Sequence, residues 1–227
     1  WGREPVWAAI HQQYVSTLRE LPRERFGLPW WKRPLDIAAA AALLALSVPL
    51  LGALALAVRV DLGEGILYRQ RRIGLGERPF EILKFRTMRP QPDPPRLSDA
   101  ERLSRLGRFL RRASLDELPQ LFSILRGQMS FIGPRPLLER YLAFYNPEER
   151  RRHRVRPGLT GWAQIHGRNE LPWRERLALD AWYVDHLSFA LDARIAWRTL
   201  WKTLRGRGVV EDPSAAMLDL DQERQTA

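Results

Sequence analysis

Two adjacent carboxylates, Asp116 and Glu117, stand a few residues after two arginines, Arg111 and Arg112. Neighbouring carboxylates repel each other unless a cation offsets their charge, and such a pair can hold Mg²⁺. Guanidinium groups match phosphate oxygens in a fork, so the arginines can hold a phosphate beside the pair. This combination suits phosphoryl transfer, with Asp116 as a covalent nucleophile. The alternative is a solvated acidic pair at the start of a helix, which is the more common situation for charged runs.

Three further clusters suit the binding of phosphate. Lys84 and Arg86 occupy alternate positions and would share one face of an extended segment. Arg135 stands in a rigid Gly-Pro-Arg-Pro loop, and the segment 156–169 is rich in glycine with cationic ends. Backbone N–H groups in glycine-rich loops can cradle anions. Each cluster alone is more often structural than functional, and the sequence has neither a Walker-type loop nor a dinucleotide fingerprint.

The composition favours a polyanionic partner. The 227 residues include 37 lysines and arginines against 26 acidic residues, a formal net charge of +11. Such an excess fits nucleic acid, an anionic membrane surface or a phosphorylated substrate. The sequence contains no cysteine, which excludes disulfides, thiolate metal sites and a cysteine nucleophile. The first residue is Trp1 rather than methionine, which leaves open whether a preceding membrane region has been removed.

An apolar segment runs from Ile37 to Val58 and reaches the roughly 20 residues needed to cross a bilayer. Basic residues stand on both sides of it: Lys32, Arg33 and Arg59. Together with Ser47 and Pro49 near its middle, they fit a helix that enters the membrane, bends and leaves by the same face. A spanning helix and a buried helix of a soluble protein are the alternatives. We expect Asp36, at the entrance, to pair with one of the preceding basic residues at headgroup level.

The other segments predict one hairpin and several helices. Two short strands are expected within 66–85, joined by a glycine-rich turn. Helices are predicted over 7–18, 103–112 and 137–154, the last of them interrupted near Asn146 and Pro147. Tryptophans and arginines share a long helical region over 177–204, so this region either lies on a membrane surface or contributes its tryptophans to the core. From Val210 onward the polar, acidic composition predicts a disordered tail.

Two rival functions remain open on composition. The positive charge and the nine tryptophans suggest a nucleic-acid-binding protein. Against this hypothesis, the arginines alternate with acidic residues and an apolar segment of membrane length lies among them. A membrane-anchored scaffold without activity is the second alternative, in which the acidic pair would have no chemical role.

Together and in this order, the motifs resemble those of the bacterial sugar transferases, the polyprenol-phosphate phosphoglycosyl transferases of the small monotopic type. The resemblance extends from Lys32 to about Val209. Its most specific parts are KFRTM at 84–88, SLDELPQ at 114–120, MSFIGPRP at 129–136 and the glycine-rich segment 156–169. The stretch 179–192 fits the same pattern.

The resemblance implies a role for particular residues. Asp116 would be the nucleophile, Glu117 its catalytic partner, and Mg²⁺ would bind at this pair. Arg111 and Arg135 match the phosphate-binding arginines of the family. Four residues match positions of the nucleotide-sugar pocket: Lys84, Arg86, Gln164 and Arg168.

The implied fold is α+β and mainly helical. A re-entrant membrane helix-break-helix at 32–60 follows an N-terminal amphipathic segment at 1–31. Its break lies at Ser47 and Pro49. In this chain Val48 separates the two residues, whereas family members often have the serine and the proline directly adjacent. A compact cytosolic catalytic domain at 61–209 contains a short β-hairpin and interfacial amphipathic helices, and the tail occupies 210–227.

The implied reaction transfers a sugar 1-phosphate from a UDP-sugar to undecaprenyl phosphate through a phospho-aspartate, with release of UMP. It is the first membrane step of glycoconjugate or exopolysaccharide assembly. The implied location is the cytoplasmic face of the bacterial inner membrane, where a monotopic enzyme meets an anionic membrane surface. Nucleic acid is not expected as a partner, and a homodimer is left open. The motifs decide neither the UDP-sugar nor the pathway.

Overall fold

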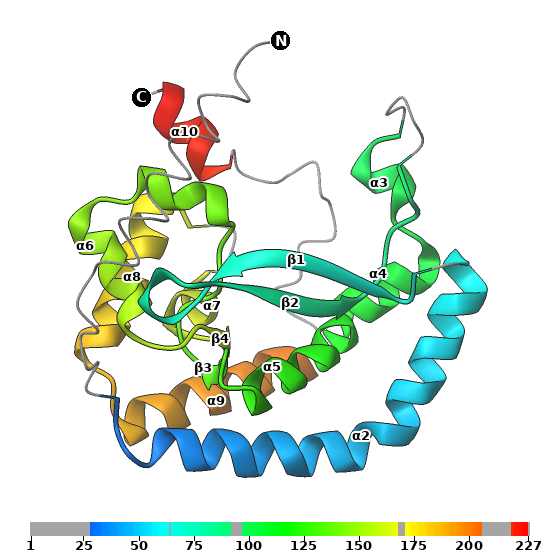
Figure 1. Cartoon of the computed structure of the whole chain (residues 1–227), viewed down its shortest axis with the longest axis horizontal. Helices are drawn as coiled ribbons and strands as arrows, with labels where there is room; N and C mark the ends of the chain where they lie inside the picture. The colour runs from blue at the N-terminus through cyan, green and yellow to red at the C-terminus, as the bar shows by residue number, and fades with distance from the viewer. Residues whose placement is uncertain (1–27, 64, 92–96, 168–170, 206–218, 227) are drawn as a thin grey trace.

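The computed structural model describes residues 28–63, 65–91, 97–167, 171–205 and 219–226 (Figure 1). The helix predicted over 7–18 lies outside these residues, and so does Arg168. The architecture is mainly helical with two small sheets, which confirms the predicted α+β class.

The apolar segment forms one long helix, α2 (Lys32–Leu62). Figure 1 shows that α2 bends about midway along its length. Pro49 lies inside the helix, where it cannot donate a backbone hydrogen bond and its ring crowds the preceding turn. The Ser47 hydroxyl donates to the Leu44 carbonyl oxygen at 3.2 Å, a contact that also favours helix bending. The predicted break is therefore a bend within a continuous helix.

The inner face of α2 packs on the body of the protein and its outer face is bare. The buried side chains recur along one stripe: Lys32, Asp36, Ala40, Leu44, Leu54 and Val58. On the other face Leu46 and Val60 are each 79% exposed. The helix is long and apolar enough to cross a membrane, and only 17% of its most apolar window is buried. This exposure counts against a core helix of a soluble protein and indicates membrane association.

Polar contacts attach the start of α2 to later segments. The Asp36 carboxylate accepts hydrogen bonds from the Ser130 hydroxyl and the Phe131 backbone N–H, both at 3.0 Å. Lys32 Nζ lies 2.5 Å from Asp192 Oδ2, and the Tyr183 hydroxyl donates to the same carboxylate at 2.7 Å. The expected pairing of Asp36 with a neighbouring basic residue is therefore wrong, because partners distant in sequence satisfy these charges.

The predicted hairpin is present. Strands β1 (Leu67–Ile73) and β2 (Pro79–Phe85) pair antiparallel with Leu67 opposite Phe85, and the short 3₁₀ helix η1 (Leu75–Glu77) connects them. A second, parallel pair joins β3 (Ser130–Ile132) and β4 (Gly158–Thr160), which the sequence pattern did not predict. Phe80 and Ile82 of the hairpin pack with α2 in one hydrophobic cluster.

The helices are shorter and more numerous than predicted. The helix expected over 103–112 is α4 (Arg105–Arg112), which begins late because the Ser104 hydroxyl caps it, and α3 (Asp99–Arg102) precedes it. The helix expected over 137–154 is three pieces: η3 (Glu139–Phe144), α6 (Pro147–Arg150) and η4 (Arg151–Arg154). Asn146 caps α6 and Pro147 is its first residue, so the chain must turn there.

Two helices replace the long region predicted over 177–204. They are α8 (Trp173–Asp185) and α9 (Phe189–Leu204), and α7 (Trp162–His166) precedes them. The Ser188 hydroxyl accepts a hydrogen bond from the Leu191 N–H, which starts α9 afresh. Between α4 and β3 the chain forms η2 (Leu115–Gln120) and α5 (Leu121–Leu125).

The disorder predicted from Val210 onward does not hold for the part of the tail that the structure describes. Residues 220–226 form α10 (Leu220–Thr226). Leu220 is fully buried in a cluster with Trp173 and Leu177, and Tyr141 donates a hydrogen bond to Asp219 at 2.6 Å. One apolar anchor and a few polar contacts hold the helix, a combination that composition does not reveal.

Breaking the buried pair between Lys32 and Asp192 on one side only should destabilise the fold. Asp192→Asn leaves the ammonium without a counter-charge, so we expect the free energy of unfolding to fall by about 3–5 kcal/mol. Urea titration of the purified protein in a mild detergent measures this. The double variant Lys32→Met, Asp192→Leu removes both charges and should recover most of the loss. A single variant as stable as the wild type would contradict the prediction.

Candidate active site

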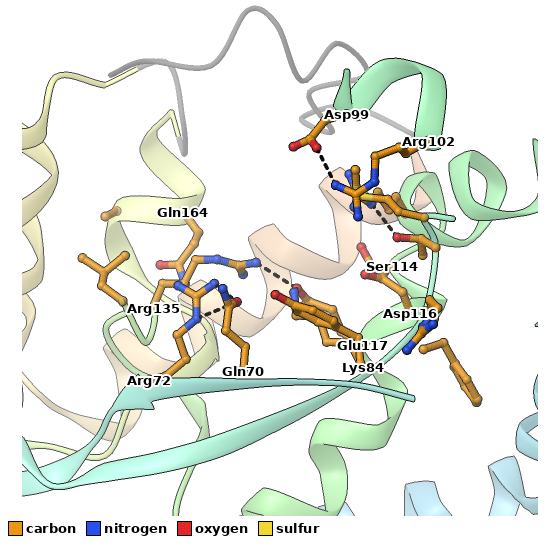
Figure 2. A pocket seen from close by; sticks show the side chains of 18 of the residues that line it. Gln70, Arg72, Lys84, Asp99, Arg102, Ser114, Asp116, Glu117, Arg135 and Gln164 are labelled. Atoms are coloured by element: carbon orange, nitrogen blue, oxygen red, sulfur yellow. Dashed lines mark hydrogen bonds and ion pairs between the residues drawn. The ribbon is translucent and has the colours of Figure 1, made fainter. Parts of the chain in front are cut away.

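A pocket of about 710 Å³ opens between the hairpin, η2, the loop after β3, and helices α3, α7 and α8 (Figure 2). This volume is typical of sites for small molecules. Nine arginine and lysine side chains line the pocket, against four carboxylates. Such an excess of positive charge indicates an anionic ligand.

The adjacent carboxylates lie in this pocket at the start of η2. Ser114, directly before η2, has a left-handed backbone conformation with φ of 56°. A non-glycine residue in this region is uncommon, and such residues occur preferentially at functional sites. The turn aims the carboxylate of Asp116 into the pocket, where the residue is 8% exposed (Figure 2).

Glu117 is fixed by two cations. Its Oε1 accepts hydrogen bonds from Lys84 Nζ at 2.6 Å and from Arg135 Nη2 at 2.8 Å. Burial alone would raise the pKa of Glu117, but the opposing attraction of Arg135 and Lys84 outweighs it and holds the pKa well below its usual range. Glu117 is therefore a permanent carboxylate that joins the hairpin, η2 and the loop after β3.

Asp116 has a different environment from its neighbour. No hydrogen bond joins its carboxylate to another side chain in the part of the chain that the structure describes. Burial raises the pKa of Asp116; Lys84 opposes this shift and the Glu117 carboxylate adds to it. Glu117 is thus fixed by its two cations, whereas the Asp116 carboxylate is available to a ligand.

Hydrogen bonds to neighbouring residues fix the two arginines of the predicted phosphate site. Arg111, at the end of α4, donates from Nε to the Thr87 hydroxyl at 3.0 Å. Arg152 Nη2 donates a hydrogen bond to the backbone carbonyl oxygen of Arg135 at 2.7 Å. Both guanidinium groups reach the pocket that contains Asp116.

The structure brings together the described residues of the predicted site. Seven of them line the pocket: Lys84, Arg86, Arg111, Asp116, Glu117, Arg135 and Gln164. The eighth, Arg168, lies outside the described residues. The pocket therefore unites motifs that are up to 80 positions apart in the sequence.

The sequence profile of the bacterial sugar transferases matches residues 28–206. The chain belongs to this family. It is 46% identical over 181 residues to the uncharacterized sugar transferase EpsL of Bacillus subtilis (strain 168), covering 78% of this chain and 89% of that protein. Over 209 residues it is 44% identical to the UDP-glucose:undecaprenyl-phosphate glucose-1-phosphate transferase of Caulobacter vibrioides. This match covers 86% of this chain and 78% of that protein. It is also 38% identical over 196 residues to the exopolysaccharide production protein ExoY of Rhizobium meliloti (strain 1021), covering 78% and 87%.

This sugar transferase has pocket residues that sequence reasoning missed. Arg152 and Asp180 form a buried ion pair at 2.8 Å with side chains 1% and 2% exposed. Asp180 lies within the 179–192 pattern, but nothing in the sequence identified its partner. Gln70 and Arg72 of β1 also line the pocket, and Gln70 Oε1 accepts from Arg72 Nε at 3.1 Å. Burial and the nearby Arg135 lower the pKa of Arg72 to about 10.

The alternation of side chains along β1 is the sequence signal that could have identified Gln70 and Arg72 as pocket residues. Tyr68, Gln70 and Arg72 occupy every second position of β1, and Tyr68 is paired with Lys84 of β2. Side chains of directly paired residues share a face of the sheet, so these residues face the same pocket as Lys84.

The glycine-rich segment has a structural role where the structure describes it. The Gly133 N–H donates to the Thr160 carbonyl oxygen at 2.9 Å, and the Gly158 N–H donates to the Pro134 carbonyl oxygen at 3.0 Å. A Cβ on Gly158 would lie 2.2 Å from the Gly133 nitrogen, so only glycine allows this approach. These N–H groups are used in pairing β3 with β4, which corrects the expected anion cradle at these positions and fixes the loop that carries Arg135.

A metal site built only from protein ligands is not present among the described residues, which contain no group of three or more histidines, aspartates or glutamates suited to an ion. The ligands on offer are the Asp116 carboxylate and the second oxygen of Glu117. Mg²⁺ commonly binds through one or two carboxylates together with substrate phosphates and water. The pair thus fits Mg²⁺ that arrives with a phosphorylated substrate.

Proposed function

We propose that this enzyme transfers a sugar 1-phosphate from a UDP-sugar to undecaprenyl phosphate and releases UMP. The names of its Caulobacter and Rhizobium relatives, which specify UDP-glucose, undecaprenyl phosphate and exopolysaccharide production, support this proposal. UDP-glucose is accordingly the first donor to test. The reaction would be the first membrane step of exopolysaccharide or glycoconjugate assembly.

One observation carries the mechanism: Asp116 is a carboxylate available to a ligand in a pocket rich in cations. In the first step a carboxylate oxygen of Asp116 attacks the phosphorus on the sugar side of the diphosphate. An acyl phosphate bond forms, the bond to the bridging oxygen breaks, and UMP leaves with that oxygen. In the second step an oxygen of the lipid phosphate attacks the phospho-aspartate, which forms the lipid diphosphate sugar and frees the carboxylate.

The surrounding side chains assist these steps. Arg111 and Arg135 bind the phosphate oxygens and stabilise the charge that spreads over them in the transition state. Glu117 holds Lys84 and Arg135 in place through its shared oxygen. The remaining nucleotide-sugar residues in this proposal are Arg86, Gln164 and Arg168.

Asp116→Asn should abolish turnover, because an amide cannot attack phosphorus and form the covalent intermediate. The measurement is UMP release from UDP-glucose with undecaprenyl phosphate in detergent. Membrane association and the unfolding transition should match those of the wild type, since removing a buried charge without a partner costs the fold little. Turnover within about tenfold of the wild type, a barrier change below roughly 1.4 kcal/mol, would rule out the nucleophile.

We further propose Mg²⁺ as the cofactor, held by Asp116, Glu117 and the substrate diphosphate. Bound there, the ion would neutralise the diphosphate and make UMP a better leaving group. The cations Lys84 and Arg135 beside the carboxylates disfavour the ion without the negative charge of the substrate.

Excess EDTA should stop UMP release, and added Mg²⁺ should restore it. Binding experiments provide a readout that does not need turnover: Mg²⁺ should raise the affinity of the Asp116→Asn variant for UDP-glucose less than that of the wild type. Full activity in EDTA would show that the arginines and Lys84 stabilise the diphosphate without a metal ion.

The enzyme is proposed to lie on the cytoplasmic face of the bacterial inner membrane, with α2 as a re-entrant hairpin. Both halves of α2 pack on the same folded body, the first half through Ala40 and Leu44 and the second through Leu54 and Val58. A straight spanning helix would carry the second half away from those contacts. Helix α9 exposes Trp197 by 66% and Trp201 by 48%, which suits an anionic membrane surface.

The two ends of α2 should therefore be on the same side of the membrane. Single cysteines introduced near Trp7 and at Glu64 should both be protected from an impermeant thiol reagent on intact cells and react after lysis. Labelling of the Trp7 site alone on intact cells would establish a spanning helix. Pro49→Ala removes the feature that favours the bend, so it should shift labelling toward the spanning pattern.

A further inference from the structure

We propose that the nucleoside of the UDP-sugar binds at the closed end of the pocket, against Gln164 of α7 and Asp180 of α8. The sugar then points toward the open end, formed by Asp99 and Arg102 of α3. This assignment rests on the proposed function, because it orients the same substrate within the same pocket.

Gln164 is the first observation. The residue is 6% exposed and lines the pocket, yet neither Oε1 nor Nε2 of its amide has a hydrogen-bond partner among the described residues. Leaving a buried amide unpaired costs free energy in the free protein. A ligand with a donor and an acceptor side by side would satisfy both atoms, and the N3–H and an adjacent carbonyl of uracil form such a pair.

Asp180 is the second observation. Its Oδ2 accepts from Arg152 Nη2 at 2.8 Å, whereas Oδ1 is buried without a partner in the described structure. Because Arg152 already balances the charge, the free oxygen suits a neutral donor such as a ribose hydroxyl. The closed end thus offers hydrogen bonds to an uncharged polar group.

The position of the diphosphate determines how the UDP-sugar is oriented in the pocket. It must lie beside Asp116, where Lys84 and Arg135 meet at Glu117. In Figure 2 Gln164 lies to the left of this centre, and Asp99 and Arg102 lie above it, on α3. The two substituents of the diphosphate therefore have two different directions open to them, one toward Gln164 and one toward α3.

The construction of the two ends decides which substituent goes where. Gln164 and Asp180 are buried side chains on helices that contact each other, so the closed end is preformed. The Asp99 side chain is 62% exposed on the four-residue α3. A rigid, buried site suits the uridine that all UDP-sugars share, and an exposed end suits a sugar that differs between donors.

Gln164→Met tests the assignment, because methionine has a similar shape without the polar atoms. Titration calorimetry on the full chain in detergent measures UMP binding. We expect UMP affinity to fall roughly tenfold to hundredfold through the loss of two hydrogen bonds. KM should rise by a similar factor for UDP-glucose and UDP-galactose alike. The melting temperature of the ligand-free variant should stay equal or rise, since an unpaired amide has been removed.

Asp99→Asn is the matched control at the open end. It should leave UMP affinity unchanged and alter the ratio of kcat/KM between the two donors. If Gln164→Met instead changes this ratio while UMP binds normally, the sugar occupies the closed end and the assignment is wrong. Unchanged UMP affinity and unchanged KM would show that the substrate does not reach Gln164. Wild-type UMP release tests the proposed function separately, because its absence would refute that function whatever the variants bind.

Discussion

One carboxylate oxygen connects the parts of this active site. Glu117 Oε1 accepts hydrogen bonds from Lys84 on β2 and from Arg135 in the loop after β3, and Glu117 itself belongs to η2. Three segments distant in sequence therefore meet at one atom. The Lys84 and Glu117 side chains are 19% and 16% exposed, so separating them would leave largely buried charges without compensation. Because Glu117 takes both cations, Asp116 remains available to a ligand. The difference between two neighbouring acidic residues thus arises from their partners and not from their residue types.

The pocket holds more positive charge than its own carboxylates balance. Arg135 lies close enough to Arg72 to help lower the pKa of Arg72, and the fold holds the two arginines together through Gln70, Glu117 and the buried Arg152–Asp180 pair. Repulsion of this kind is relieved when a diphosphate enters. The cations are then already in position, so little reorganisation accompanies binding or the chemical step. The fold therefore tolerates repulsion between these cations, which keeps the site ready to bind an anion.

The sequence predicted which side chains meet in the pocket better than it predicted the framework around them. Local spacing and motif order singled out Asp116, Glu117, Lys84 and Arg135, which all line the pocket, and the glycine turn identified the hairpin. The pairing of β3 with β4 was missed because three-residue strands are too short to show a period. The Arg152–Asp180 and Lys32–Asp192 pairs were missed because periodicity does not indicate partners far apart in sequence. The role of the glycines was misjudged for a related reason: close backbone approach and anion binding require the same residue type.

The attachment of α2 has a consequence for biosynthesis. Lys32 and Asp36 find their partners on α9 and β3, 160 and about 95 residues later in the chain. Synthesis from the N-terminus produces α2 before the segments that carry its partners, so its polar anchors stay unsatisfied until most of the protein has been translated. The segments made later then pack against a helix that has already been synthesised. Two of the four hydrophobic clusters in the described structure include side chains of α2. A fragment that begins after α2 would therefore lack part of its own hydrophobic core.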